Sequence, residues 1–251
     1  MQIVSWNVNG LNACIKKKGF EQIENDILPD VICIQEIKTK TEPVVIDGYN
    51  HYFNPAEQEK YSGTLFMSIE EPTDITYGIG KSDFDCEGRV ITADMGDFYV
   101  VDTYVPNSQR NLERHFFRLD WDEVYREYLT DLAEEKPVIA CGDFNATMLP
   151  IDVFPENERQ NAAEIEYESE ERANMQTLLE SGFIDAFRYL YPDKTGDYTW
   201  WSNRLYKRQE NRGWRLDYFI VSKSLTGRIE DVIHHNEIKG SDHCPIELIL
   251  K

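Results

Sequence analysis

The sequence predicts an α/β (α+β) protein in which mixed β-sheets are covered by helices. Short apolar runs recur along the chain, and such runs are typical of buried strands. Two longer stretches instead repeat their apolar residues at helical spacing. Strand and helix signals do not alternate strictly, and several strands follow one another closely enough to pair antiparallel. That order favours mixed sheets over a purely parallel one.

Each predicted strand is an apolar run short enough to cross a sheet once. The runs are Ile3–Trp6, Val31–Ile34, Gly63–Ile69, Val90–Ala93, Phe98–Val105, Val138–Cys141, Tyr198–Trp201, Leu216–Val221 and Ile246–Leu250.

Two amphipathic helices are predicted between these strands. The first runs from Trp121 to Leu132 and places an apolar stripe on one face, made of Trp121, Val124, Tyr125, Tyr128 and Leu132. The second runs from Glu170 to Ser181. It ends at Gly182 because glycine readily adopts the left-handed conformation that stops a helix.

Length and apolar content indicate a single domain over residues 1–251 that does not cross a membrane. No apolar run approaches the roughly 20 residues that a membrane span needs, and the chain enters a strand-like run at once. We therefore expect a cytoplasmic, intracellular location. The five cysteines are an odd number without a CxxC pair. That pattern argues against a disulfide framework or a zinc cluster.

The charge balance is strongly acidic, with 46 acidic and 26 basic residues and a net charge of −20. Proteins that bind nucleic acids usually carry a basic surface, so composition alone argues against such a partner. Acidic residues are concentrated between Asp152 and Arg172, where large apolar residues are few. We interpret this segment as a solvated surface insertion.

Acidic and amide side chains recur where predicted strands begin or end. Glu36 closes the run that starts at Val31, and Asp143 follows the run that starts at Val138. The same context holds for Asn7, Asn9, Asn145, Asp217, Asp242 and His243. Polar side chains at the rim of a packed sheet can converge on one pocket, and we expect these to do so.

Carboxylates that converge repel one another unless a hard cation lies among them. Oxygen ligands without thiolates suit Mg²⁺, with Mn²⁺ as the alternative, and do not suit zinc. A single aspartate at a strand end is also a common turn or cap residue, so the prediction depends on the whole set. An imidazole next to a carboxylate, as in Asp242-His243, is a ready donor to a phosphate oxygen. No polar partner can be named for the other four histidines, which we interpret as structural or surface residues.

Eight motifs follow one another between Ile3 and Leu248. They are Ser5–Leu11 (SWNVNGL), Ile34–Lys38 (IQEIK), Tyr61–Gly63 (YSG), Glu87–Val90 (EGRV), Tyr104–Asn107 (YVPN), Cys141–Asn145 (CGDFN), Gly213–Tyr218 (GWRLDY) and Gly240–Pro245 (GSDHCP). In this order they resemble the exonuclease III family of abasic-site endonucleases, within the endonuclease/exonuclease/phosphatase superfamily. Thr199–Ser202 (TWWS) followed by GWRLDY narrows the resemblance to the abasic-site branch.

The resemblance implies a four-layer α/β sandwich with two packed mixed sheets and helices outside. It also implies a Mg²⁺-dependent endonuclease that cuts duplex DNA on the 5′ side of an abasic site. Such an enzyme would also have 3′–5′ exonuclease and 3′-phosphodiesterase activity on blocked 3′ ends, and we expect it to act as a monomer.

Site roles follow from the same resemblance, position by position. Asp143 resembles the residue that activates the attacking water, and Asn145 resembles its positioning partner. His243, oriented by Asp217, resembles the donor to the scissile phosphate. Further active-site contacts are implied for Tyr104 and Asn7, and metal contacts for Glu36, Asn9 and Asp242.

DNA contacts are expected from Arg110, Trp214, Arg89, Arg215, Lys38 and Arg212. Trp214 resembles a wall of the pocket for the extruded sugar, and Arg110 resembles an arginine that inserts into DNA. Loops near the proposed site are locally basic: Lys16–Lys18, Lys38, Lys40, Arg110, Arg114, Arg204, Lys207, Arg208, Arg212 and Arg215. We therefore predict a basic rim around an acidic, metal-filled pit.

Two other functions compete with this prediction. The first is a general nuclease or phosphatase of the same superfamily, which the net charge of −20 favours. The second is a non-catalytic descendant that binds DNA or protein. It would lack part of the catalytic set, whereas Glu36, Asp143, Asn145, Asp217 and His243 are all present.

Overall fold

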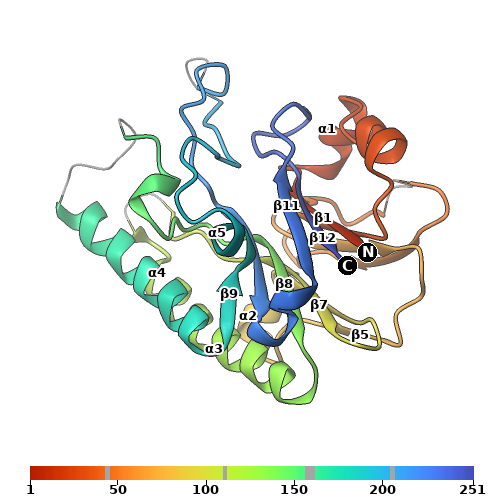
Figure 1. The fold of residues 1–251 in the computed structure, drawn as a ribbon, viewed down its shortest axis with the longest axis horizontal. Helices are drawn as coiled ribbons and strands as arrows, with labels where there is room; N and C mark the ends of the chain where they lie inside the picture. The colour runs from red at the N-terminus through yellow and green to blue at the C-terminus, as the bar shows by residue number, and fades with distance from the viewer. Residues whose placement is uncertain (43–45, 110–111, 156–161, 204–206) are drawn as a thin grey trace.

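Two mixed β-sheets pack face to face in the computed structural model, which describes residues 1–42, 46–109, 112–155, 162–203 and 207–251 (Figure 1). The first sheet has the strand order β11-β12-β1-β2-β4-β3. Its strands are β1 (Gln2–Asn7), β2 (Val31–Gln35), β3 (Asn50–Asn54), β4 (Thr64–Ser68), β11 (Ile229–His234) and β12 (Ile246–Leu250).

The second sheet has the order β5-β6-β7-β8-β10-β9. Its strands are β5 (Asp74–Tyr77), β6 (Val90–Asp94), β7 (Tyr99–Tyr104), β8 (Val138–Asp143), β9 (Phe183–Asp185) and β10 (Asp217–Ser222). Each sheet has one parallel pair at its centre, β1 with β2 and β7 with β8, and the other described pairings are antiparallel.

Helices flank the two sheets. In the described residues they are α1 (Leu11–Lys16), η1 (Ile23–Ile27), α2 (Ser82–Asp85), α3 (His115–Glu135), η3 (Pro150–Asp152), α4 (Ala162–Glu180), α5 (Ala186–Leu190) and η5 (Lys223–Arg228). Helices α3 and α4 lie side by side over the second sheet (Figure 1), whereas α1 and η1 pack on the first. The predicted four-layer arrangement is therefore confirmed.

Apolar side chains fill three successive layers. Between the sheets, residues such as Ile3, Cys33, Cys141 and Phe219 are buried together. A second cluster lies between the second sheet and the long helices, and a third lies between the first sheet and α1. The five cysteines are free, as predicted. In the described residues, no helix combines the length and apolar character needed to cross a membrane.

The strand predictions succeed at the centre of each sheet and fail at its edges. Within the described residues, eight predicted runs correspond to the eight interior strands, whereas the four edge strands β3, β5, β9 and β11 were not predicted. The ninth run, Tyr198–Trp201, is not a strand. Its Trp200 makes isolated bridges to Trp214 and His243, so it crosses the end of the sandwich without joining a ladder.

The interpretation of residues 152–172 as a solvated insertion is wrong at both ends of the segment. Asp152 is fully buried and paired with Arg215. Helix α4 begins at Ala162, which extends the predicted helix by about two turns. Near the other end of the segment, Glu171 is only 5% exposed.

Gly142 brings β8 unusually close to β7 just before Asp143. Its φ is +143°, and a Cβ there would lie 1.8 Å from the carbonyl oxygen of Thr103. We therefore predict that Gly142→Ala lowers the free energy of unfolding by at least about 2 kcal/mol, because the backbone must shift to relieve the clash. Gly227→Ala is the matched control, since no atom lies within 4 Å of its Cβ position. Equal urea midpoints for the two variants would contradict this prediction.

Candidate active site

The central strands of both sheets bring the candidate residues to one end of the sandwich. Asn7 ends β1 and is in register with Gln35, which ends β2 and precedes Glu36. Tyr104 ends β7 and is in register with Asp143, which ends β8. Because each pair is parallel, the carboxyl ends of its two strands lie at the same edge.

Two antiparallel neighbours add their first residues to the same edge. Asp217 begins β10 and pairs in register with Asp143. Asp242 and His243 precede β12, which runs antiparallel to β1. The predicted convergence of strand-end residues therefore holds for the described residues, since an antiparallel strand begins where its neighbour ends.

Asn7 joins the acidic residues of the two sheets. Its Nδ2 donates to Asp143 Oδ2 at 2.8 Å and to Glu36 Oε1 at 2.9 Å. Its Oδ1 accepts from the backbone N–H of Asn9 at 2.9 Å. Asp143 makes the equivalent turn, accepting from the N–H of Asn145 at 2.9 Å. These bonds fold the chain back at the strand ends and fix both side chains.

The backbone is also unusual at this edge. Asn9, Glu36, Lys38 and Asn145 all have positive φ, between 46° and 54°. Asparagine tolerates this region, but glutamate and lysine seldom adopt it. Such conformations persist where the surrounding structure over-determines them, and they concentrate at functional sites.

His243 lies between two carboxylates. Its Nδ1 donates to Asp217 Oδ2 at 2.9 Å, and its Nε2 lies 3.8 Å from Asp143 Oδ2. Burial lowers the pKa of the imidazole, but the Asp217 and Asp143 carboxylates outweigh that effect and raise the pKa to about 10. The ring is therefore an imidazolium at neutral pH, with Nδ1–H bonded to Asp217 and Nε2–H available to donate.

The Asp143 carboxyl has a perturbed pKa of its own. Burial raises this pKa to about 7, the charge of His243 opposes the rise, and Asp217 and Glu36 reinforce it. A buried carboxyl with a pKa near neutral pH can accept a proton when a reaction releases one. Beneath it, Gln35 Nε2 donates to the Asp102 carboxyl at 2.6 Å and links the two sheets.

Glu36 and Asn9 present oxygen atoms on the other side of Asn7. The ammonium of Lys38 contacts both the Glu36 carboxylate and Asn9 Oδ1. Burial acts to raise the pKa of Glu36, but Lys38 and Asn7 outweigh it and hold the pKa below its ordinary value. Asp242 Oδ1 accepts from Asn9 Nδ2 at 3.0 Å. The oxygens of Glu36 and Asn9 already hold the Lys38 ammonium, and together with Asp242 they form a donor set without thiolates that fits a hard divalent cation.

A second group of possible metal ligands, Asp143, Asp217 and His243, also lies within 4.8 Å. We favour the oxygens of Glu36 and Asn9 because Mg²⁺ prefers an all-oxygen donor set, whereas the second group includes an imidazole whose Nδ1 is already bonded to Asp217. The charge on His243 already compensates the two carboxylates of that group.

Amide groups order the loops after β7 and β8. Asn145 Nδ2 donates to the Val105 carbonyl at 2.9 Å, and Asn107 Nδ2 donates to Asn145 Oδ1 at 3.0 Å. Tyr104 is 9% exposed, and burial together with the charge of Glu36 raises its phenol pKa. Asn107 belongs to the YVPN motif, but no sequence pattern indicates its contact with Asn145.

Two tryptophans form one side of the site. Trp200 and Trp214 have ring centroids 5.8 Å apart in an edge-to-face arrangement, and Trp200 Nε1 donates to Asp242 Oδ2 at 3.2 Å. The Trp200 ring also lies 6.4 Å from that of His243. An apolar wall therefore borders the charged cluster.

The prediction that Arg89 and Arg215 contact DNA is wrong, because both side chains are buried in the protein. Arg89 is 2% exposed and donates to Glu87 and to the Tyr104 carbonyl. Arg215 is fully buried, with Nε 2.8 Å from Asp152 and Nη2 2.7 Å from Asp185. Arg89 supports Tyr104, whereas Arg215 supports the segment between Trp214 and the start of β10.

The other basic residues differ in how far they face solvent. Lys16–Lys18 are exposed, Arg212 lies beside Phe154 and Glu210, and Lys38 faces Glu36 as described. Arg208 turns inward and donates to the carbonyls of Ser241 and Ile238. Arg110 and Arg204 lie outside the described residues. The basic rim therefore stays a prediction, with fewer surface residues than expected.

Each of the remaining histidines has an acidic partner, which the sequence did not indicate. The pairs are His51–Glu42, His115–Glu170, His234–Asp197 and His235–Glu247. All four lie outside the cluster around Asp143, in agreement with their interpretation as structural residues.

Buried carboxylates, an imidazolium and a group of oxygens suited to a cation define a phosphoester hydrolase at the rim of two packed sheets. The model of the Endonuclease/Exonuclease/phosphatase family matches residues 4–243, and the chain belongs to that family.

The similar proteins match this chain over almost its whole length. An exodeoxyribonuclease of Bacillus subtilis is 44% identical over 100% of this chain and 99% of its own length. The DNA repair nuclease APEX1 of Danio rerio is 43% identical over 100% of this chain and 82% of its own length. The crystal structure of AP endonuclease LMAP from Leishmania major has a TM-score of 0.89 at 29% identity, covering 100% of this chain and 87% of that one. The predicted family and enzyme class, a DNA-repair nuclease, are confirmed.

If the reaction requires Asp143 as a carboxylate and His243 as an imidazolium, its rate should fall at both low and high pH. We predict that activity falls below pH about 7, where Asp143 gains a proton, and above pH about 10, where His243 loses one. Asp217→Asn removes a charge that raises the His243 pKa, so the upper limit should move to lower pH. The pH dependence of kcat/KM measures both limits.

Glu247→Gln is the matched control, because it removes the carboxylate partner of His235 outside the site. An upper limit that stays in place in Asp217→Asn, or that moves equally in Glu247→Gln, would contradict the prediction.

Proposed function

We propose that this chain is a Mg²⁺-dependent DNA-repair endonuclease that hydrolyses the phosphodiester on the 5′ side of an abasic site in duplex DNA. We further propose 3′–5′ exonuclease and 3′-phosphodiesterase activity on blocked 3′ ends. The observation that carries the proposal is the position of His243, held as an imidazolium between Asp217 and Asp143 and next to the oxygens of Glu36 and Asn9. The names of the similar proteins support DNA as the substrate.

Asp143 is proposed to accept the proton of the attacking water. Its Oδ2 receives the Asn7 amide and its Oδ1 receives the Asn145 N–H, so its orientation is fixed before substrate arrives. Preorganised proton acceptors typically contribute about 10²–10⁴-fold to the rate. The Asn145 side chain, held between Val105 and Asn107, is proposed to orient the same water.

His243 is proposed to donate from Nε2 to a non-bridging oxygen of the scissile phosphate. The Asp217 carboxylate on Nδ1 keeps the ring protonated and fixes its plane. Donors aimed at developing negative charge stabilise the transition state more than the ground state. Tyr104 is proposed as a further donor, and its raised pKa keeps its phenol protonated at neutral pH.

The residues proposed to hold the divalent ion are Glu36, Asn9 and Asp242. When bound, the ion supplies positive charge at the scissile phosphate and at the leaving oxygen. Asn7 links this group to Asp143 through one amide nitrogen, with bonds of 2.9 Å and 2.8 Å. The metal residues and the proton acceptor are therefore positioned as one unit.

Trp200 and Trp214 are proposed to form the wall that receives the extruded abasic sugar. An abasic nucleotide has no base to unstack, so it leaves the duplex at lower cost than an intact nucleotide. An apolar wall next to the charged cluster favours a sugar without its base. Arg212 and the exposed lysines are proposed to contact the phosphate backbone. We propose that the enzyme acts as a monomer and in the cytoplasm.

Incision of a defined duplex tests the proposed reaction. We predict that a 5′-labelled duplex with one tetrahydrofuran abasic analogue is cut once, on the 5′ side of the analogue, in the presence of Mg²⁺. Excess EDTA should abolish the cut, and Asp143→Asn should slow it by about 10²–10⁴-fold. Asp120→Asn, an equivalent change at an exposed residue of α3, should cut at the wild-type rate.

An undamaged duplex of the same sequence completes the design. No incision at the analogue, together with hydrolysis of a simple phosphodiester, would identify a general nuclease or phosphatase of the same family. Incision that persists in EDTA would exclude a role for the divalent ion.

A further inference from the structure

An arginine lies on the buried face of α3. Arg118 is fully buried and continues the stripe formed by Trp121 and Tyr125. Burying a guanidinium is costly unless acceptors and counter-charges surround it. The contacts of Arg118 therefore indicate what this charge does inside the protein.

Two of its donors bind the loops that carry the catalytic residues. Arg118 Nη1 donates to the carbonyl of Pro106 at 2.7 Å, and Nη2 donates to the carbonyl of Phe144 at 3.0 Å. Pro106 follows Tyr104 after β7, and Phe144 follows Asp143 after β8. One planar group thus fixes the distance between the two loops, because its N–H groups diverge in a rigid fork.

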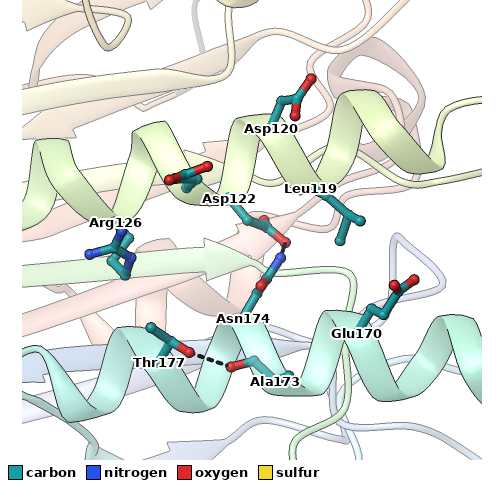
Figure 2. Close-up of a pocket in the computed structure, with 9 residues that line it drawn as sticks. Leu119, Asp120, Asp122, Arg126, Glu170, Ala173, Asn174 and Thr177 are labelled. Atoms are coloured by element: carbon teal, nitrogen blue, oxygen red, sulfur yellow. Dashed lines mark hydrogen bonds between the residues drawn. The ribbon is translucent and has the colours of Figure 1, made fainter.

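Acidic residues of α3 and α4 compensate the charge. Arg118 Nε donates to Asp122 Oδ1 at 2.7 Å, and Glu171 lies 3.8 Å from Nη1. Asp122 also accepts from Asn174 of α4 at 3.2 Å, and Figure 2 shows these two side chains facing each other between the helices. They line a groove of about 380 Å³.

Helix α4 reaches the same two loops through neighbouring residues. Glu171 Oε1 accepts from Ser108 Oγ at 3.1 Å, in the loop after β7. Arg172 donates to the carbonyl and hydroxyl of Thr147 at 3.0 Å and 3.1 Å, in the loop after β8. The end of the acidic segment therefore holds active-site loops in place.

The loops held by Arg118 are the ones that meet at Asn145. The Asn145 side chain hydrogen-bonds to the Val105 carbonyl and to Asn107. Both hydrogen bonds form only if the two loops keep their spacing. On the other side, the Phe144 N–H donates to the Leu216 carbonyl at 2.8 Å, one residue before Asp217. A shift of the Phe144 backbone would therefore displace Asn145 and Asp217.

We propose that Arg118 is a positioning residue for phosphodiester hydrolysis. It acts through the carbonyls of Pro106 and Phe144, which set the spacing of the loops after β7 and β8 and so the position of Asn145 between them. A residue that only filled the core would need no charge at this point. The inference rests on the proposed function for its reaction, although any phosphodiester that the wild-type protein hydrolyses can report it.

Arg118→Met keeps an apolar side chain of similar shape but removes the guanidinium. Arg118→Lys keeps the positive charge but also lacks the guanidinium's forked N–H donors. We expect Arg118→Met to lower kcat by about 10²-fold, since displacements near 1 Å can cost that much, while KM changes less than about 3-fold. Arg118→Lys should recover only part of the rate, because one ammonium cannot hold both carbonyls and Asp122.

Leu129→Ala is the matched control for stability. Leu129 is fully buried on the same helix, and it packs within the apolar cluster on the second sheet. This variant should lower the melting temperature and leave kcat within about 2-fold of wild type. Equal losses of kcat in Leu129→Ala and Arg118→Met at matched melting temperatures would overturn the proposal.

A double-mutant cycle with Asn145→Ala separates positioning from general stability. If Arg118 acts through Asn145, the loss of kcat in the double variant will be close to the larger single loss. Losses that multiply as independent effects would overturn the proposal. The cycle is run on the abasic duplex and on an undamaged phosphodiester. Failure to cut the abasic duplex in the wild-type protein concerns only the proposed function.

Discussion

His243 compensates a concentration of buried negative charge at one end of the two sheets. Its Nε2 lies 3.8 Å from Asp143, and its Nδ1 donates to Asp217. Opposite unit charges at this separation attract by about 4 kcal/mol at an effective dielectric constant of about 20. On the far side of Asn7, the Lys38 ammonium acts in the same way on Glu36. The strand ends can therefore bring their carboxylates together without forcing the sheets apart.

The pattern of apolar runs predicted the interior strands of both sheets because these strands are buried on both faces. Such strands read as continuous apolar runs, and the eight interior strands were predicted. Edge strands such as β5 (Asp74–Tyr77) and β11 (Ile229–His234) are partly exposed and carry charged residues, so an apolar pattern cannot reveal them. Asn7, Glu36, Asp143 and His243 were found because each borders a predicted strand.

Arginines were the residues that the sequence assigned least well. Arg89 and Arg215 were expected on the DNA-binding surface, yet each pairs with carboxylates inside the protein. The partners of Arg215, Asp152 and Asp185, lie far from it in sequence, and no local pattern reports such pairs. Arg118 was not predicted at all, because α3 begins at His115, six residues before the predicted start at Trp121. Burial removes Arg89 and Arg215 from the surface that was expected to contact DNA.

In the proposed reaction, water activated at Asp143 attacks the phosphorus on the 5′ side of the abasic sugar. A single-turnover incision in water enriched in ¹⁸O, with mass spectrometry of both DNA fragments, shows where the oxygen of that water is incorporated. Attack of water on this phosphorus should place one ¹⁸O atom per incision on the 5′-phosphate of the fragment that carries the abasic sugar, and none on the upstream 3′ end. Label on a 3′-phosphate of the upstream fragment, or cleavage without incorporation of label, would contradict it.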